Sequence, residues 1–263
     1  MLPLGHFVPY TLSDLSVVIP QASQYVRRIK WFLPQYVRAT PIEVIKNTIV
    51  VYDPEDQETR SVLADYGSRG IRGITTTPPH STYKMEAGFK EVKTRLCARM
   101  HNDCFVARSD WAQVVVDHFN NIKTPNMIGA FNISGGLNQP VIQKMMEMYP
   151  AWKVDNSQAS SPGGYFSAFC MIAQSYIMKT IYPLVVEINE GRMDKEDVLF
   201  TYLASVFNVD LIGWSNMYGF LTLGSKAYGD FDEGEVPPRF EDQSIISENG
   251  EPSLMPVFNR VEI

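Results

Sequence analysis

The stretch LSVVIP, residues 15–20, is a short apolar run rich in β-branched side chains that ends at a proline. Such a run is typical of a strand buried on both faces of a parallel sheet. Two similar runs follow, NTIVVYD at 47–53 and GIRGITT at 70–76, each after a segment with a helical pattern. The order strand, helix, strand, helix, strand predicts a parallel sheet with helices on its faces, because such crossovers are right-handed. The predicted fold class is therefore α/β.

The first two connecting segments are the predicted helices of this unit. Residues 24–39 place apolar side chains at helical spacing, although Pro34 predicts a kink or an end within that helix. Residues 57–67 predict a helix that stops at Gly67. Further helices are expected at 83–96, at 110–122 with Asp110 as N-cap, and at 139–149, 175–189 and 198–207, and further strands at 94–100, 126–133, 165–173 and 209–214.

The formal net charge of −6 belongs to one end of the chain. Residues 229–263 contain nine Asp or Glu and two Arg, which leaves 20 acidic and 21 basic residues in the first 228. Periodicity also fades there, so we expect a domain over 1–228 and an extended acidic tail over 229–263. The nearly neutral domain does not exclude an anionic substrate.

The cysteines and the apolar segments indicate a location for the protein. Cys97, Cys104 and Cys170 show no Cys-x-x-Cys spacing, which favours buried thiols in a reducing compartment over disulfides or a zinc site. Nowhere do 18 apolar residues run together, and residues 1–15 lack a basic start with a continuous apolar core. We therefore expect a cytoplasmic protein with no membrane span and no signal peptide.

Parallel α/β sheets bind ligands outside the carboxyl ends of their strands, so residues just after each strand are the first candidates for a site. Pro20 ends the first strand, and the loop QAS after it either presents backbone groups to a nucleotide or simply follows a stop signal. Asp53 ends the second strand, where a carboxylate can accept hydrogen bonds from a ribose hydroxyl or a base N–H. An ordinary Asp-Pro turn is the alternative interpretation.

The stretch ARMHNDCFVARSD, residues 98–110, interrupts a strand-like pattern with polar residues. Asp103 stands beside Asn102 just after the candidate strand, where one carboxylate could hold Mn²⁺ or Mg²⁺ together with phosphate oxygens and water. His101 is either a helper of this ion or a core-facing ring. A plain turn at the end of a strand explains the same residues without a ligand.

A fourth polar pair, Glu196 and Asp197, lies at an expected helix start. The positive end of the helix dipole stabilises carboxylates there, and an ionised carboxylate beside a cleft can take a proton from a hydroxyl nucleophile. Simple capping of the helix is an equally good explanation. Each of the four signals is weak alone, and their order along the chain is more specific.

That order resembles the family 2 type of glycosyltransferases with the GT-A fold, over roughly residues 14–215. The resemblance rests on SVVIP, on IVVYD, on the Asn-Asp pair and on the later Glu-Asp pair. It implies a Rossmann-like, mostly parallel central sheet flanked by helices. It also implies an inverting, metal-dependent transfer of a hexose or pentose from a nucleotide-sugar donor to a hydroxyl acceptor, with Mn²⁺ or Mg²⁺ as cofactor.

The resemblance carries over residue by residue. Asp53 would contact the base or ribose of the donor, and Asn102 with Asp103 would replace the metal motif, with Asp103 as the metal-binding carboxylate. Asp197 would be the catalytic base and Glu196 its neighbour. The sequence departs from the family pattern at His101, where an Asp is common, and in lacking Asp-Asp-Gly-Ser after the second strand.

Two other functions stay open. A nucleotidyltransferase on a related fold commonly has a glycine-rich, basic loop after the first strand, and PQASQYVRR contains no glycine. A non-catalytic carbohydrate- or nucleotide-binding module is favoured by His101 and disfavoured by the retention of both Asp103 and Asp197. The acceptor could be a glycan, a lipid, a protein or a hydroxylated nucleic-acid base. Nucleic acid is weakly supported, because RRIK at 27–30 is the only compact basic run.

Overall fold

The computed structural model of the chain describes residues 7–78, 80–102, 104–106, 109–132, 147, 165–190, 196–213, 221–223 and 253–254. Eight strands form the central sheet, in the order β10-β8-β6-β7-β4-β1-β2-β3. Their bounds are Leu15–Pro20 (β1), Thr48–Tyr52 (β2), Arg72–Thr75 (β3), Leu96–Met100 (β4), Asn126–Asn132 (β6), Tyr165–Gln174 (β7), Asp210–Gly213 (β8) and Ser253–Leu254 (β10).

The sheet is mostly parallel. Strands β1 to β4 pair in parallel, as do β6 and β8, whereas β7 runs antiparallel to both β4 and β6, and β10 antiparallel to β8. A separate two-stranded sheet joins Cys104–Val106 (β5) to Leu221–Leu223 (β9). The fold class predicted from the sequence, an α/β fold with a Rossmann-like, mostly parallel sheet flanked by helices, is confirmed by this arrangement.

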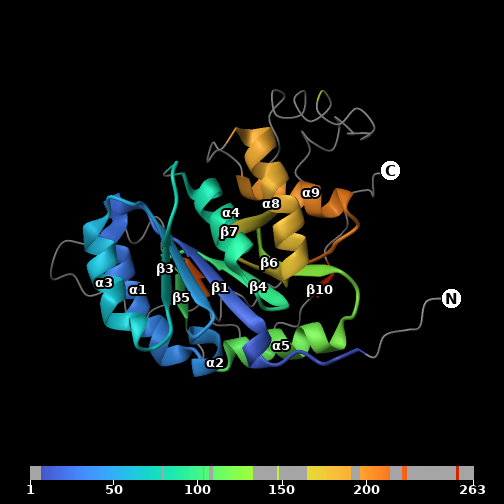
Figure 1. Ribbon diagram of the computed structural model, residues 1–263. Coiled ribbons are helices and arrows are strands. Elements are labelled where there is room, and N and C mark those ends of the chain that lie inside the picture. Colours follow the sequence, from blue (N-terminus) through green and yellow to red (C-terminus); the bar gives the residue numbers. More distant parts are fainter. Residues whose placement is uncertain are drawn as a thin grey trace.

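Helices cover both faces of the sheet (Figure 1). Successive side chains of each strand point to opposite faces of the sheet, which divides the core into two clusters. In β1, Val17 and Ile19 point to one face and Val18 to the other. On the first face lie α1 (Val26–Ala39), α2 (Ile42–Ile45), α3 (Gln57–Gly67) and α5 (Trp111–Asn121), and on the second α4 (Ser81–Glu91), α8 (Ser175–Asn189) and α9 (Glu196–Val206). None of the helices that the structure describes is long and apolar enough to cross a membrane.

The structure settles three details of the predicted helices. Helix α1 does not end at Pro34 but continues to Ala39, because side chains on both sides of the proline, Phe32 and Tyr36, are buried against the sheet. Helix α4 ends at Glu91 and not near residue 96, because the five buried residues Leu96–Met100 pair as β4. Asp110 occupies the N-cap position of α5, yet its side chain makes no capping hydrogen bond.

Two predictions concern parts of the chain that are described only in small pieces. The helix expected at 139–149 lies outside the described residues, apart from the helical Glu147. Of the acidic tail at 229–263, Ser253–Leu254 pairs with β8 as a strand of the central sheet. This part of the tail therefore adds to the fold, and the division at residue 228 stays a prediction.

Helix α4 lies close to the sheet because of one glycine. A Cβ added to Gly88 would stand 2.3 Å from Cγ1 of Val18 and 3.0 Å from Cγ2 of Val51, so only glycine allows the helix to rest on β1 and β2 at this point. Lys84 lies one turn earlier on the same face of the helix. The close contact thus brings Lys84 to the carboxyl ends of these strands.

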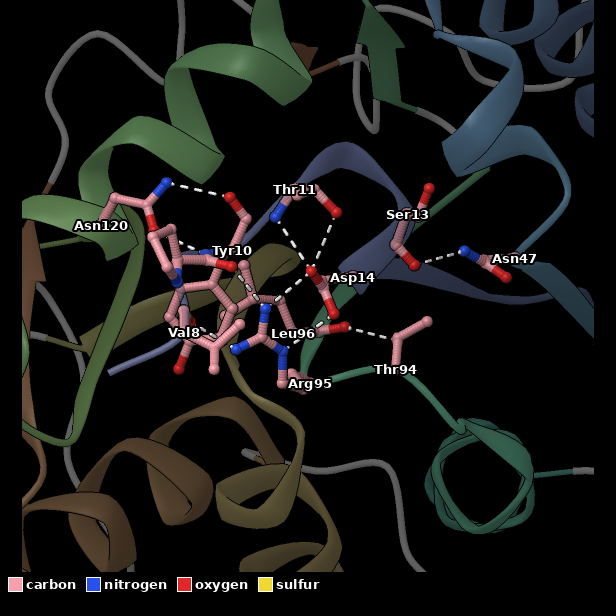
Figure 2. Close-up of polar contacts among 11 residues, drawn as sticks. Val8, Tyr10, Thr11, Ser13, Asp14, Asn47, Thr94, Arg95, Leu96 and Asn120 are labelled. Atoms are coloured by element: carbon pink, nitrogen blue, oxygen red, sulfur yellow. Dashed lines mark hydrogen bonds and ion pairs between the residues drawn. The ribbon is translucent and has the colours of Figure 1, made fainter. Parts of the chain in front are cut away.

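A cluster of polar contacts lies at the amino-terminal edge of the sheet, opposite to the edge that Lys84 reaches (Figure 2). Arg95 precedes β4, and its guanidinium donates to both carboxylate oxygens of Asp14, at 2.8 Å each, and to the carbonyls of Val8 and Pro9, at 2.7 Å each. It also lies over the ring of Tyr10. The hydrogen bonds from Arg95 lower the pKa of Asp14 to about 2, so the segment before β1 is held to the sheet by a charged pair.

Candidate functional site

A cavity of about 580 Å³ opens at the carboxyl ends of β1, β2 and β4, within the volume range of small-molecule sites. Its walls come from the ends of these strands, from the 3₁₀ turn Ser23–Tyr25 and from the start of α4. Three of the residues that the sequence predicted for donor binding, Pro20, Asp53 and Asn102, line it. The structure therefore brings together side chains that are far apart in the sequence.

Asp53 is held in the cavity wall by a buried cation. Nζ of Lys84, a side chain that is 1% exposed, lies 2.8 Å from Oδ1 of Asp53 and donates to the backbone carbonyl of Gln21 at 2.7 Å. The backbone N–H of Ser23 approaches the other carboxylate oxygen at 3.3 Å. The Asp53 carbonyl also accepts from the Asp56 N–H, so the Asp-Pro turn is present as well. The turn interpretation is therefore confirmed for the backbone of Asp53, and donor binding by its carboxylate stays a prediction.

Asn102 connects the loops that follow β1 and β4. Its Nδ2 donates to Oε1 of Gln21, and both side chains are buried. Gln21 is itself fixed, because its backbone N–H donates to the carbonyl of Val51 and its Nε2 to that of Ala22, both at 2.8 Å. The side-chain amide of Asn102 therefore has a defined orientation beside the cavity. Gln21 carried no sequence signal beyond its place in the loop.

The predicted metal ligand, Asp103, lies outside the described residues. Across the described part of the chain, no group of three His, Cys, Asp or Glu side chains is placed to hold a metal ion. A single carboxylate with phosphate oxygens and water, as the sequence predicted, requires no such group. The Asn102 amide, next to Asp103, is the described feature that agrees with a site at this loop.

His101 is not a metal ligand through its Nε2. This nitrogen lies 2.8 Å from Nη2 of Arg99, and because a guanidinium only donates, the nitrogen accepts the hydrogen bond. Burial, together with the positive charges of Arg99 and Arg28, lowers the pKa of His101 well below its usual value, so the ring is neutral. His101 lines the cavity as a ring oriented by Arg99.

Arg99 belongs to a buried ion pair that sequence reasoning did not predict. It is fully buried on the face of β4 that packs against α8 and α9, where its guanidinium pairs with Glu196 and donates to the hydroxyl of Tyr182. Burial alone would lower the pKa of Arg99, but the carboxylate of Glu196 raises it, so the guanidinium is charged. One sequence signal could have found it: Arg99 lies two residues after Cys97, so in a buried strand the two side chains point to the same face.

Glu196 and Asp197 occupy the first turn of α9, as the sequence predicted. Glu196 is 5% exposed and lies behind the cavity wall, where Ser81, a lining residue, donates to its Oε1 at 3.0 Å. Asp197 is half-buried, and its Oδ1 accepts from the N–H of Val198 at 2.9 Å. Its negative charge contributes to the raised pKa of Arg99, which places it near the buried pair. Neither Asp197 nor Glu196 is among the residues that line the cavity, and the role of Asp197 as a base stays a prediction.

Part of the only compact basic run faces the cavity. Arg28, from RRIK, lines the cavity with its guanidinium 3.9 Å from the ring centre of Tyr25. An arginine stacked on an aromatic ring keeps its charge while its plane is held in place. The run RRIK therefore contributes one of its cations, Arg28, to the cavity and not to a basic surface patch.

Solved structures of glycosyltransferases are similar to this chain. A mannosyltransferase from Pyrobaculum calidifontis, in complex with GDP-Man and Mn²⁺, matches with a TM-score of 0.49 and 11% identity over 76% of this chain and 54% of its own. The glycosyltransferase GlyE of Streptococcus pneumoniae TIGR4 matches with a TM-score of 0.47 and 14% identity over 78% and 46%. This chain spans about half the length of these two proteins.

A third similar structure belongs to another class of enzyme. The 4-diphosphocytidyl-2C-methyl-D-erythritol synthase of Anaerococcus prevotii DSM 20548 matches with a TM-score of 0.45 and 12% identity over 76% of this chain and 87% of its own. No protein-family model matches the sequence, and no curated protein matches it. At these identities and TM-scores the likeness assigns no activity, which has to rest on the cavity itself.

Proposed function

We propose that the chain is a glycosyltransferase that takes a nucleotide sugar as its donor. The observation that carries this proposal is the convergence of Asp53, Lys84 and Asn102 on one cavity at the carboxyl ends of β1, β2 and β4. Open α/β sheets bind nucleotides at this edge. The cavity of about 580 Å³ is large enough for a ligand of this size.

Asp53 is proposed to bind the nucleoside. Its carboxylate accepts hydrogen bonds only, so it suits a ribose hydroxyl or a base N–H and rejects an acceptor atom at the same place. Lys84 restrains one oxygen of this carboxylate, which fixes its plane before the ligand arrives. Tyr25, with Arg28 stacked on it, forms an adjacent part of the wall and brings positive charge toward the diphosphate.

The loop after β4 is proposed to bind the diphosphate. Asp103 would hold Mn²⁺ or Mg²⁺ there, and the ion would stabilise the negative charge that grows on the leaving diphosphate. Asn102 supports this loop through its hydrogen bond to Gln21, which is fixed to β2 by its backbone. These hydrogen bonds hold the start of the loop beside the cavity.

Asp197 is proposed as the base. Neither carboxylate lines the cavity, but Glu196 is engaged in a buried ion pair with Arg99, so of the two Asp197 is assigned to the acceptor hydroxyl. Asp197 would take the proton as the hydroxyl oxygen attacks the anomeric carbon and the bond to the diphosphate breaks, which inverts that carbon in a single displacement. The acceptor is a hydroxyl-bearing glycan, lipid, protein or nucleic-acid base.

The loop after β1 favours sugar transfer over nucleotidyl transfer. It forms a short 3₁₀ turn at Ser23–Tyr25, and Gln21 within it is fixed by hydrogen bonds to Val51 and Ala22. Such a loop has no glycine that would let its backbone wrap around a triphosphate. A cytoplasmic location also belongs to the proposal, and it is supported by the free, buried thiols of Cys97 and Cys170.

A screen of nucleotide sugars with Mn²⁺ or Mg²⁺ tests the proposal, scored by thermal shift and by hydrolysis of the donor. The wild-type protein should bind at least one donor and cleave it slowly. Asp103→Ala should lose the metal-dependent part of donor binding, whereas Asp197→Ala should still bind and turn over about 10²- to 10⁴-fold more slowly. Binding without cleavage by the wild type, with every acceptor class supplied, would indicate a binding module instead.

A further inference from the structure

The ion pair between Arg99 and Glu196 joins two parts of the chain that the proposed reaction needs at a fixed distance. Arg99 lies near the end of β4, two residues before His101. Glu196 begins α9, and Asp197 follows it. Both charged side chains are buried, at 0% and 6% exposure. The pair therefore links the diphosphate loop to the helix that carries the proposed base.

The stability of the fold does not explain this pair well. A single contact joins Nη2 of Arg99 to Oε1 of Glu196, and within the described structure Nε of Arg99 and Oε2 of Glu196 are buried without a hydrogen-bond partner. Removing two charges from water is costly, and this cost is repaid only when the remaining polar atoms are satisfied as well. Replacing a buried ion pair by well-packed apolar side chains of similar volume is often neutral or stabilising.

The pair touches the cavity from behind at two points. Nη2 of Arg99 donates to Nε2 of His101, and the hydroxyl of Ser81 donates to Oε1 of Glu196. His101 and Ser81 both line the cavity. On its far side the pair is held by the hydroxyl of Tyr182, from α8. One buried cluster therefore sets the positions of β4, α4, α8 and α9 around the cavity.

We propose that Arg99 and Glu196 are positioning residues for sugar transfer, an inference that rests on the proposed function. Their ion pair fixes the separation between His101 and Asn102, which begin the segment proposed to bind the diphosphate, and Asp197, which would face the acceptor. Reacting groups that are displaced by about 1 Å lose around 10²-fold in rate. The fork of the guanidinium is needed, because it reaches a carboxylate, a phenol and an imidazole at the same time.

Three variants separate positioning from stability. Glu196→Gln keeps the shape but removes one charge, Arg99→Lys keeps the charge but removes the fork, and the double variant Arg99→Met with Glu196→Leu removes both charges together. Each is assayed for kcat, for KM of the nucleotide sugar selected in the donor screen, and for the midpoint of thermal unfolding, with kinetics measured well below that midpoint. We expect kcat to fall about 10²-fold in all three, while the donor KM changes only a few-fold.

The double variant decides between the two roles. Because it leaves no lone charge in the core, its unfolding midpoint should lie above those of the single variants, while its kcat stays low. If the pair is only structural, every variant that is folded at the assay temperature should instead have the wild-type kcat. Should Arg99→Lys not fold, Glu196→Gln and the double variant still give this comparison.

A matched control lies at the opposite edge of the sheet. Asp14→Asn weakens the ion pair with Arg95, far from the cavity, and should lower the unfolding midpoint without changing kcat. Failure of the proposed function looks different from failure of this inference. In the first case the wild-type protein binds no nucleotide sugar; in the second it binds and transfers, and the three variants keep the wild-type kcat.

Discussion

Lys84 and Asp53 form an ion pair in which Nζ lies 2.8 Å from Oδ1 and the lysine is 1% exposed while the aspartate is 13% exposed. The cation is thus inside the protein and the anion at the surface of the cavity. A ligand meets a carboxylate whose position is already fixed. The pair also connects α4, which carries the lysine, to the loop after β2.

Replacing Lys84 by Met should destabilise the protein, because the charge of Asp53 would lose its buried partner. We expect a loss of about 3 kcal/mol in the free energy of unfolding, measured by chemical denaturation. Lys90→Met in the same helix is the control, since Lys90 is 65% exposed and pairs with Glu86 at the surface. That change should cost less than about 1 kcal/mol, and equal losses for the two variants would contradict the burial of the first pair.

Asp53→Asn should weaken donor binding while leaving the backbone turn intact. A hydrogen bond to a charged acceptor contributes about 1.5 to 3 kcal/mol, so the dissociation constant of the nucleotide sugar should rise about tenfold or more in titration calorimetry. Glu55→Gln serves as the control, because Glu55 is exposed and does not line the cavity. An unchanged constant for Asp53→Asn would place the nucleoside elsewhere.

Gly88→Ala should destabilise the protein by about 1 to 3 kcal/mol, because the new methyl group would overlap Val18 and force α4 away from the sheet. Donor binding should weaken as well, since Lys84 and Ser81 belong to the same helix. Gly67→Ala is the comparison, because a Cβ there meets nothing within 4 Å. A Gly88→Ala protein as stable as Gly67→Ala would show that the helix is farther from β1 than described.

Acid should weaken the anchor at the amino-terminal edge. The pKa of Asp14 is lowered from 3.8 to about 2 by Arg95, so the stabilisation is complete above about pH 4 and is lost as the pH falls through 2. Because Arg95 is 40% exposed, solvent screening limits the effect to about 1 kcal/mol. Denaturation curves of wild type and Asp14→Asn should converge between pH 4 and pH 2, and parallel curves would exclude this pair as the cause.

The strands and the edge of the sheet that carries the site could be predicted from the sequence. Buried parallel strands require continuous β-branched runs, so LSVVIP appears as β1 over the predicted residues. The polar residues after these strands, Asp53 and Asn102, then fall at one edge by the geometry of a parallel sheet. The start of α9 at Glu196 was indicated by its paired carboxylates.

The partners of the site residues could not be predicted in this way. Nothing in the local pattern of the helix predicted at 83–96 marks Lys84 as buried, and its burial beside Asp53 follows from the close packing of this helix on the sheet. Arg99 and Glu196 are 97 positions apart, and nothing local in either segment specifies the other. Tertiary pairing of this kind follows from how α8 and α9 pack on β4, which depends on the whole core.

The reversed direction of β7 has a practical consequence for engineering. Asn132 pairs with Tyr165, so the chain leaves the sheet after β6 and rejoins it at β7 at adjacent points of the edge that carries the cavity. The two attachment points are tied together by the ladder whatever lies between them. A foreign segment that joins Asn132 to Tyr165 therefore has to bridge only the short distance between two paired residues of this ladder.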